Sequence, residues 1–348
     1  MAKAPIPQHV IELIKTYQKA QIELINIIAK STRETTVTAY RKRVLASVNE
    51  ELRVLNEYAT GWAQENIPIA YKNGVANTYE TFRELNIEVG KIQINTRVLK
   101  TLVDNASGLL IDANNYVGRM INDEIRKVSL EVISEKVATG STVKEAQAKL
   151  VKRLADNGVA NIVDKRGRAI RLESYAEMVA RTTTREATNK GAIEAVSELG
   201  EDLVRMTWHN ASCPICAPLE GRIYSISGDS KSYPPLSEAL PDGRLTPHPN
   251  CRHSFVPYFA KYDDDAEKNK TFSNRPFEIG KQEQAKVDAY YKAQKEKAAL
   301  NRVKKDWQAA RLVAPTEAPK TLGAYTRLKS NNPEEFKKLR EKVKTAKQ

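Results

Sequence analysis

Apolar residues recur at helical spacing through much of the first 160 residues. They stand three or four positions apart, which places them on one face of a helix. The first stripe consists of Val10, Leu13, Ile14, Tyr17, Ala20, Leu24, Ile27 and Ile28. A second stripe consists of Val37, Tyr40, Val44, Val48, Leu52, Leu55, Ala59 and Trp62, and a third of Leu99, Leu102, Ala106, Leu109, Ala113, Val117, Met120, Val128 and Val132. Such stripes pack together in helical bundles, so the sequence predicts that residues 1–160 are mostly helical.

Capping residues predict the limits of two further helices. Thr142–Glu145 has the capping-box pattern ahead of one apolar stripe, and Asn157-Gly158 can end that helix in the left-handed conformation. Ser174–Glu177 repeats the capping box. The helix that follows it can end at Gly200, because glycine adopts a positive φ at the C′ position without steric cost.

Strand-like patterns begin after residue 160. Residues 161–172 predict a hairpin around the turn-forming segment 165–168. Residues 203–208 alternate with period two and predict a short strand. One side of this strand carries Val204, Met206 and Trp208. The change from helical to strand periodicity marks a boundary near residue 160.

One segment carries nearly all of the metal-binding residue types. Six of the seven Cys and His residues lie between 209 and 253. Cys213-Pro214-Ile215-Cys216 can present two thiolates from a tight turn, and His248-Pro249-Asn250-Cys251 can repeat that geometry with an imidazole and a thiolate. Sulfur and imidazole ligands select zinc over magnesium or calcium, and four protein ligands leave no position for a catalytic water. The spacing therefore predicts a structural Zn²⁺ ion bound by Cys213, Cys216, His248 and Cys251.

Three alternatives stay open around this segment. His253 can replace His248 as the imidazole ligand, although the spacing of His248 from Cys251 matches the Cys-x-x-Cys half-site better. His209 can supply an outer hydrogen bond or simply lie at the end of the strand. Without a metal, the same residues are three reduced structural cysteines with histidines nearby.

Positive charge is concentrated in the last quarter of the chain. The chain has 56 Lys and Arg residues against 43 Asp and Glu, a net charge of +13, and residues 261–348 hold 22 basic and 13 acidic residues, or +9 of that charge. Helical patterns over residues 287–307 and after Asn332-Pro333 predict a basic helical extension. Such a segment can contact DNA through counterion release, or it can be a solvated helical tail.

The sequence gives no sign of secretion or of a membrane span. Residues 10–28 are amphipathic rather than continuously apolar, and nowhere do 18 successive apolar residues occur. Three cysteines crowded into one stretch favour thiols in a reducing compartment over a disulfide framework. We therefore expect assembly in a cytoplasm and no contact with a membrane.

These patterns together predict an α+β protein. At 348 residues the chain is long enough for two or three domains. We expect a helical domain over residues 1–160, a hairpin and helix with a zinc-stabilised module over residues 161–260, and the basic helical extension over residues 261–348.

A run of ordered motifs between residues 167 and 253 resembles a known protein family. The motifs are Gly167-Arg168, Leu172–Tyr175, Met178–Arg185, His209, Cys213–Cys216, Pro218, Gly221, Tyr224–Gly228 and His248–His253. They resemble the phage minor capsid protein 2 family, whose zinc-like segment is similar to that of the head morphogenesis proteins of the Mu F type. The resemblance implies a structural, non-enzymatic protein of a tailed-phage virion, present in few copies in the head and assembled in the host bacterial cytoplasm. It also implies portal and major capsid proteins as partners, and residues 261–348 add possible contact with packaged DNA.

Two enzyme classes are alternatives to a structural role. An HNH-type zinc-dependent endonuclease also combines cysteine turns with histidines, but it needs an open metal position and a histidine base, whereas here nearly every Cys and His belongs to the closed site. An ADP-ribosyltransferase needs a Ser-Thr-Ser-like strand and a Glu-x-Glu pair. Arg181–Thr184 lies on a predicted helix, and Glu198–Glu201 has the wrong spacing. The sequence therefore favours a structural protein.

Three polar residues share one face of the predicted helix after Ser174. Arg181, Arg185 and Asn189 are each four positions apart along this face. They can bind a carboxylate or phosphate of a partner chain, or they can brace their own domain. Both roles stay open, because the sequence does not show which face is buried.

Overall fold

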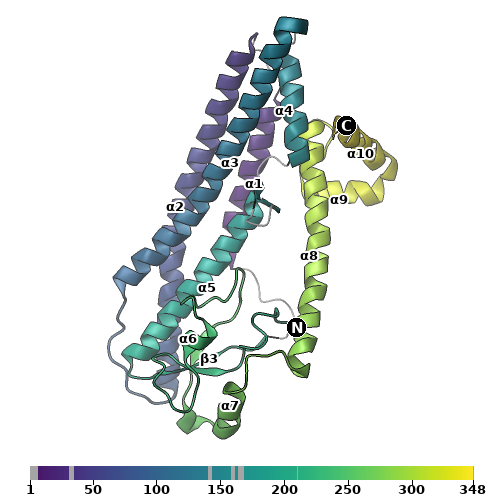
Figure 1. Ribbon diagram of the computed structural model, residues 1–348. Helices are drawn as coiled ribbons and strands as arrows, with labels where there is room; N and C mark the ends of the chain where they lie inside the picture. Colours follow the sequence, from purple (N-terminus) through teal and green to yellow (C-terminus); the bar gives the residue numbers. More distant parts are fainter. Residues whose placement is uncertain are drawn as a thin grey trace. The chain divides into compact units, whose positions relative to one another are not determined.

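The computed structural model describes residues 7–30, 35–139, 143–157, 161–163, 168–209 and 211–347. Most of these residues are helical, and two small antiparallel sheets complete an α+β fold (Figure 1). The helices are α1 (Gln8–Ala29), α2 (Val37–Glu84), α3 (Thr96–Thr139), α4 (Val143–Asn157), α5 (Leu172–Glu198), α6 (Leu236–Ala239), α7 (Ala266–Ser273), α8 (Lys281–Val313), α9 (Leu322–Asn331) and α10 (Pro333–Lys347), with a 3-10 turn at Ala260–Tyr262. The strands are β1 (Asn161–Val163), β2 (Ala169–Arg171), β3 (Leu203–Met206), β4 (Ile223–Ser225) and β5 (Phe255–Pro257).

The chain divides into two compact units, each assembled from segments that are distant in sequence. Unit 1 contains Met1–Thr60, Leu109–Glu177 and Lys297–Gln348, and unit 2 contains Gly61–Gly108 and Met178–Glu296. Helices α2, α3, α5 and α8 each contribute residues to both units. Each of the three predicted segments thus contributes to both units, and the division into those segments stays a prediction.

The predicted apolar stripes form much of the helical core. Six of the eight residues of the first stripe and all eight of the second are buried. Within unit 1, α4 packs against α1 and α10. The side-chain amide of Gln147 on α4 also donates to the carbonyls of Ile28 and Lys30, at 3.3 and 2.7 Å, where α1 ends. The end of α1 is therefore held by its neighbour, because these carbonyls have no partner within their own helix.

The third stripe was predicted one residue out of place at two points. Leu109 is 43% exposed, whereas Leu110 is fully buried. Similarly, Met120 is only partly buried and Ile121 is fully buried. Adjacent residues point about 100° apart around a helix, and both leucines satisfy a spacing of three or four from Ala106. Spacing alone therefore could not decide which of the two faces the core.

The predicted helix limits are partly confirmed. α5 begins at Leu172, two residues before the predicted capping box, and ends at Glu198. Gly200 has φ +81°, and the amide of Glu201 donates to the carbonyl of Val196 at 3.1 Å, which closes the helix as predicted. α4 ends at Asn157 as predicted, but Thr142 and Gly158 lie outside the described residues.

The predicted hairpin is confirmed in unit 1. β1 and β2 pair in antiparallel register, with Ile162 opposite Ile170. The turn residues 164–167 lie outside the described residues.

Unit 2 contains a three-stranded antiparallel sheet in the order β4-β3-β5. We name residues 203–260, which include these three strands, the sheet module. The predicted strand is shorter than expected, because β3 ends at Met206 and Trp208 is 52% exposed. Trp208 instead lies on Gly221, where a Cβ atom would stand 1.9 Å from the indole ring and where φ is +76°. An aromatic side chain therefore covers the turn instead of extending the strand.

Helix α5 approaches α2 closely within unit 2. A Cβ atom on Gly74 would lie 2.0 Å from the carbonyl oxygen of Thr188, and one on Gly191 would lie 2.2 Å from that of Tyr71. The two glycines thus allow the backbones of α2 and α5 to touch. The hydroxyl of Tyr71 also donates to the carboxylate of Glu194 at 2.5 Å. These contacts fix α5, the helix that carries Arg185 and Asn189.

The last helices are not merely a solvated tail. α9 packs against α10, and a small apolar core lies among α8, α9 and α10 in unit 1. Its buried members are Ala310, Ala314, Ala318, Tyr325 and Leu339. α10 begins at Pro333, and the side-chain oxygen of Asn332 accepts from the amide of Glu335 at 3.3 Å. The helical prediction for this segment is confirmed.

None of the helices in the described ranges is both long enough and apolar enough to cross a membrane.

Candidate metal centre

Two tight turns present the predicted ligands. The amide of Cys216 donates to the carbonyl of Cys213, and the amide of Cys251 donates to the carbonyl of His248, both at 3.1 Å. The second turn places Asn250 at φ 64°, a conformation that asparagine tolerates better than most residues. The two half-sites therefore have the matching backbone geometry that the sequence predicts.

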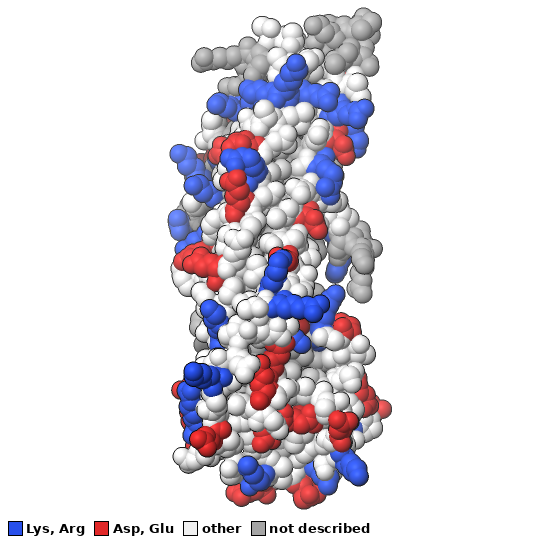
Figure 2. Space-filling view, turned by 90° about the vertical axis from the view of Figure 1, so that its left-hand side faces the viewer, with Lys and Arg blue, Asp and Glu red and all other residues white. Residues whose placement is uncertain are grey.

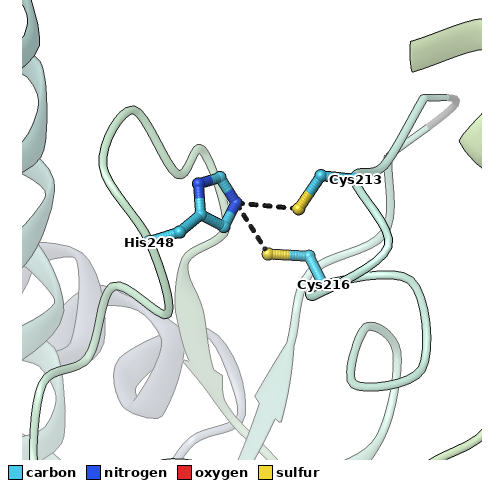
Figure 3. A group of neighbouring side chains, drawn as sticks. All are labelled: Cys213, Cys216 and His248. Carbon is cyan, nitrogen blue, oxygen red and sulfur yellow. Dashed lines mark hydrogen bonds between the residues drawn. The ribbon is translucent and has the colours of Figure 1, made fainter. Parts of the chain in front are cut away.

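The turns bring Cys213, Cys216 and His248 into one group, and Cys251 lies beside Cys216. The Nε2 atom of His248 lies 3.0 Å from the sulfur of Cys213 and 3.1 Å from that of Cys216 (Figure 3). The sulfur of Cys216 lies 3.8 Å from that of Cys251. All three cysteines are buried, and they belong to the core of the sheet module.

One contact distance matches a tetrahedral zinc site, and two are shorter. Ordinary zinc bond lengths place two sulfur ligands about 3.8 Å apart and a sulfur and a nitrogen about 3.5 Å apart. The separation of Cys216 from Cys251 matches the first value. The ring of His248 would retreat by about 0.5 Å to match the second. Cys213, Cys216 and His248 form one group of ligand atoms in this Cys/His cluster, which could hold a metal ion.

The two candidate histidines differ in what their nitrogens contact. Nδ1 of His248 lies 2.7 Å from the carbonyl of Pro249, so it carries the proton there and leaves Nε2 facing the sulfurs. Nδ1 of His253 lies 3.4 Å from the sulfur of Cys251, but Nε2 lies 2.9 Å from a carboxylate oxygen of Glu220. A second group of three ligand atoms, from Cys216, Cys251 and His253, also lies within 4.8 Å. Each histidine thus has one ring nitrogen near sulfur and the other on an oxygen acceptor, so these contacts do not choose between the two as ligand.

The three sulfurs share protons unequally in the absence of a metal. Hydrogen bonds, foremost those from Cys216, lower the pKa of Cys213 to about 4 and that of Cys251 to about 4. The contacts of Cys216 with Cys213 and Cys251, together with burial, raise the pKa of Cys216. Burial disfavours a charged His248, but its hydrogen bond to Cys213 and the nearby thiolates raise its pKa to about 9. A metal bound by Cys216 and His248 would therefore compete with their protons.

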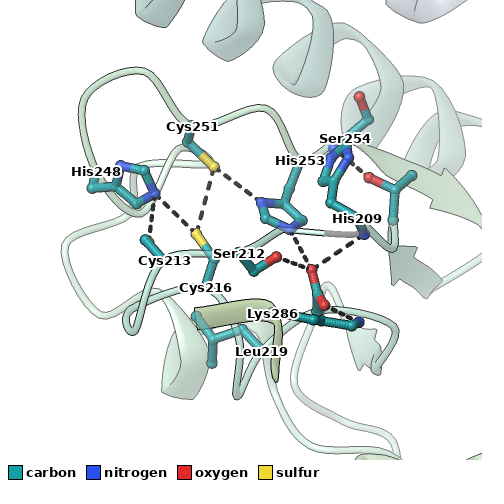
Figure 4. A network of polar contacts seen from close by, with 12 residues as sticks. His209, Ser212, Cys213, Cys216, Leu219, His248, Cys251, His253, Ser254 and Lys286 are labelled. Atoms are coloured by element: carbon teal, nitrogen blue, oxygen red, sulfur yellow. Dashed lines mark hydrogen bonds and ion pairs between the residues drawn. The ribbon is translucent and has the colours of Figure 1, made fainter. Parts of the chain in front are cut away.

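A fully buried carboxylate lies against His253. The carboxylate of Glu220 contacts His253, the hydroxyl of Ser212, the backbone amide of His209 at 3.3 Å and the amine of Lys286 (Figure 4). Burial opposes its charged form, but the hydrogen bonds from His253, Lys286 and Ser212 hold the pKa of Glu220 below its ordinary value. Sequence analysis missed this residue, because a single glutamate carries no spacing pattern.

His209 lies beside the cluster but belongs to neither group of ligand atoms found among the described residues. Its ring stands 4.5 Å from that of His253, edge to face. Burial, and then the charge of His253, lower its pKa. This position agrees with a histidine at the end of the strand, whose backbone rather than ring contacts Glu220.

Helix α5 braces the second turn. The fully buried side chain of Asn189 donates to the carbonyls of Leu245 and His253 and accepts from the amide of Phe255, at 3.1 to 3.3 Å. Arg185 donates to the hydroxyl of Ser254. Asn189 and Arg185 thus brace the segment around the second turn within their own unit.

Comparisons with known proteins agree with one another. A family model described as phage minor capsid protein 2 matches residues 6–348. A protein named "Structural protein" from Lactococcus phage LL-H is 29% identical over 170 residues, which are 46% of this chain and 44% of that protein. The chain thus matches less than half of the length of this relative. No solved structure matches the chain.

Proposed function

Because the chain belongs to the phage minor capsid protein 2 family, we propose that it is a structural head protein that contacts the portal and the major capsid proteins. Membership of this family places it in the virion. The family match over nearly the whole chain is the observation that carries the proposal. The relative from Lactococcus phage LL-H supports it, since it is named as a structural protein.

Chemical cross-linking of intact virions, followed by mass spectrometry, tests the proposed partners. Cross-links should join this chain to the portal or to the major capsid protein. Purified virions from which the chain is absent, or cross-links confined to tail proteins, would contradict the proposal.

We also infer that the Cys/His cluster binds one structural Zn²⁺ ion through Cys213, Cys216, His248 and Cys251. The orientation of His248 supports this most directly, because its protonated Nδ1 lies on Pro249 and its Nε2 faces two sulfurs. A zinc ion would hold the two turns together. Elemental analysis of the purified full chain should find one zinc per chain. Less than about a tenth of an equivalent after expression with ample zinc rejects the site.

A structural role for this site is more consistent with its residues than HNH-type cleavage of DNA. A nuclease needs a histidine free to take a proton from water near the metal. Here both ring nitrogens of His253 already face Cys251 and Glu220, and His248 faces two sulfurs. Incubation with plasmid DNA and divalent metals should leave the DNA intact. Metal-dependent cleavage that His253→Ala abolishes would support the nuclease.

We further propose that residues 261–348 bind DNA without sequence preference. These residues hold +9 of the chain's net charge. By contrast, the face of the molecule drawn in Figure 2 carries both basic and acidic side chains. If about four to six basic side chains neutralise phosphates, log affinity should fall against log salt with a slope of about −4 to −5. Unrelated duplexes should bind equally, and deletion of residues 314–348 should reduce the slope. A full chain that binds no DNA at low salt, or that prefers one duplex, contradicts this proposal.

A further inference from the structure

A continuous series of polar contacts leads from the cysteine cluster to helix α8. The sulfur of Cys251 contacts His253, His253 contacts Glu220, and Glu220 forms an ion pair with Lys286 near the start of α8 (Figure 4). All of these residues belong to unit 2. The side chains of Glu220 and His253 are 0% and 5% exposed, so water does not replace these contacts.

Glu220 is the central member of this series. One of its oxygens accepts from His253, from the hydroxyl of Ser212 and from the amide of His209, and the other accepts from Lys286. A carboxylate removed from water is tolerated only when such partners compensate for its lost hydration. Loss of its charge would leave His253 and Lys286 without their common partner, and His253 would no longer be fixed against Cys251.

Lys286 is held from a second side. Its amine lies 4.3 Å from the centre of the Trp208 ring, a distance at which a cation is attracted to an aromatic face. Trp208 is in turn fixed on Gly221. The head of Lys286 is therefore held between a carboxylate next to the cysteine cluster and a ring on the end of the sheet.

We propose that Glu220 is a positioning residue of the metal centre, which fixes Cys251 through His253 and couples metal binding to the start of α8 through Lys286. This inference rests on the proposed metal site. A metal ion that holds Cys251 also fixes the ring of His253, and hence the carboxylate that binds Lys286. Outer hydrogen-bond partners of this kind typically change metal affinity by about 10- to 100-fold when they are removed.

Cobalt spectroscopy on the full chain tests the positioning role. Glu220→Gln should still bind one Co²⁺ ion, because every proposed ligand is intact. Its sulfur-to-cobalt absorption should shift, and its Zn²⁺ affinity should fall about 10- to 100-fold. Glu238→Gln removes an exposed carboxylate of α6 in the same unit, and should leave both unchanged. A cobalt spectrum of Glu220→Gln that equals that of Glu238→Gln overturns the positioning role.

Hydrogen exchange of residues 281–296 tests the coupling. These amides should exchange faster in the zinc-stripped wild type and in Glu220→Gln than in the zinc-bound wild type. Lys286→Met keeps the apolar stem over Trp208 but removes the charge, so exchange should accelerate while the cobalt spectrum stays unchanged. If Glu220→Gln fails to fold, the stripped wild type and Lys286→Met still decide the coupling. Equal exchange with and without zinc overturns the coupling alone, whereas a wild-type chain that binds no metal rejects the site on which it rests.

Discussion

Unit 1 and the sheet module of unit 2 bury different kinds of side chain. Large buried residues of unit 1 are aliphatic and aromatic positions of long helices, such as Tyr17, Leu24 and Leu110. The core of the sheet module includes three cysteines, with Glu220 and His253 buried beside them. Buried apolar surface stabilises a fold at any moderate pH and without a ligand. Buried thiols stabilise it only when their protons or a metal are in place, so the module should respond to metal and pH more strongly than unit 1, whose buried charges include the Arg171–Glu173 ion pair.

Of the changes considered, Cys216→Ser should produce the largest difference in stability between the sheet module and unit 1. Cys216 is fully buried and its sulfur contacts both His248 and Cys251, so its loss should abolish zinc binding, on the order of 10 kcal/mol of free energy. Amides of residues 203–260 should then lose protection from hydrogen exchange, while helices of unit 1 keep theirs. Ile215→Ser is the control, because this neighbouring side chain is 55% exposed. Equal loss of protection in both units would show that the difference between them is not one of metal dependence.

The two regions also differ in how far the sequence predicts them. The stripe from Val37 to Trp62 could be predicted because helical burial repeats along the chain, and the Cys/His half-sites because metal ligands have characteristic spacings. Glu220 could not, since its partner Lys286 lies 66 residues away and neither belongs to a pattern. The contact of Gly74 with Thr188 is equally invisible, because a glycine in a helix does not indicate which backbone approaches it. Periodicity thus identifies which faces are buried, but not what they are buried against.

Leu110→Ala tests the apolar side of the comparison. Leu110 is fully buried in unit 1, so truncation should cost about 2 to 5 kcal/mol through lost burial and a cavity. Leu109→Ala, at a 43% exposed position on the same helix, should cost less than about 0.5 kcal/mol. Denaturant unfolding followed by circular dichroism measures both variants. Equal losses of unfolding free energy in the two variants would contradict the burial of Leu110 rather than Leu109 on α3. The zinc content should stay at one per chain in both variants.

Gly74→Ala tests whether helix packing, as well as metal, supports the sheet module. An added Cβ would meet the backbone of Thr188 at 2.0 Å, so α2 and α5 must separate, at a cost of about 1 to 3 kcal/mol. Since α5 carries Asn189, which braces the second turn, zinc affinity should fall as well. Gly61→Ala is the matched control on α2, because no atom lies within 4 Å of its Cβ position. That variant should gain about 0.5 to 1 kcal/mol, and a harmless Gly74→Ala would rule out the close approach.

A change of pH between 7 and 9 should act on the sheet module through the protons of its Cys/His cluster. In the metal-free chain His248 has its pKa raised from 6.5 to about 9 and Cys216 has a raised pKa, so both hold protons at pH 7. The protonated His248 stabilises the metal-free fold fully below pH 6.5, and this contribution is lost as the pH rises through about 9. Zinc competes with the same protons, so its affinity should rise by about tenfold, or about 1.4 kcal/mol, per pH unit for each proton displaced.

Calorimetry in buffers of different ionisation enthalpy measures the protons released directly. About two protons should leave per zinc bound at pH 7, one from His248 and one from Cys216. Cys213 and Cys251 should contribute none, because their pKa values of about 4 leave them as thiolates at this pH. Zinc binding without proton release, or with an affinity independent of pH, would mean that the metal does not displace these protons. The thermal stability of unit 1 should change less over the same range, because its large buried side chains are mostly aliphatic and aromatic. If the thermal stability of unit 1 depended on pH as strongly as that of the sheet module, the two regions would not differ in the way that their cores predict.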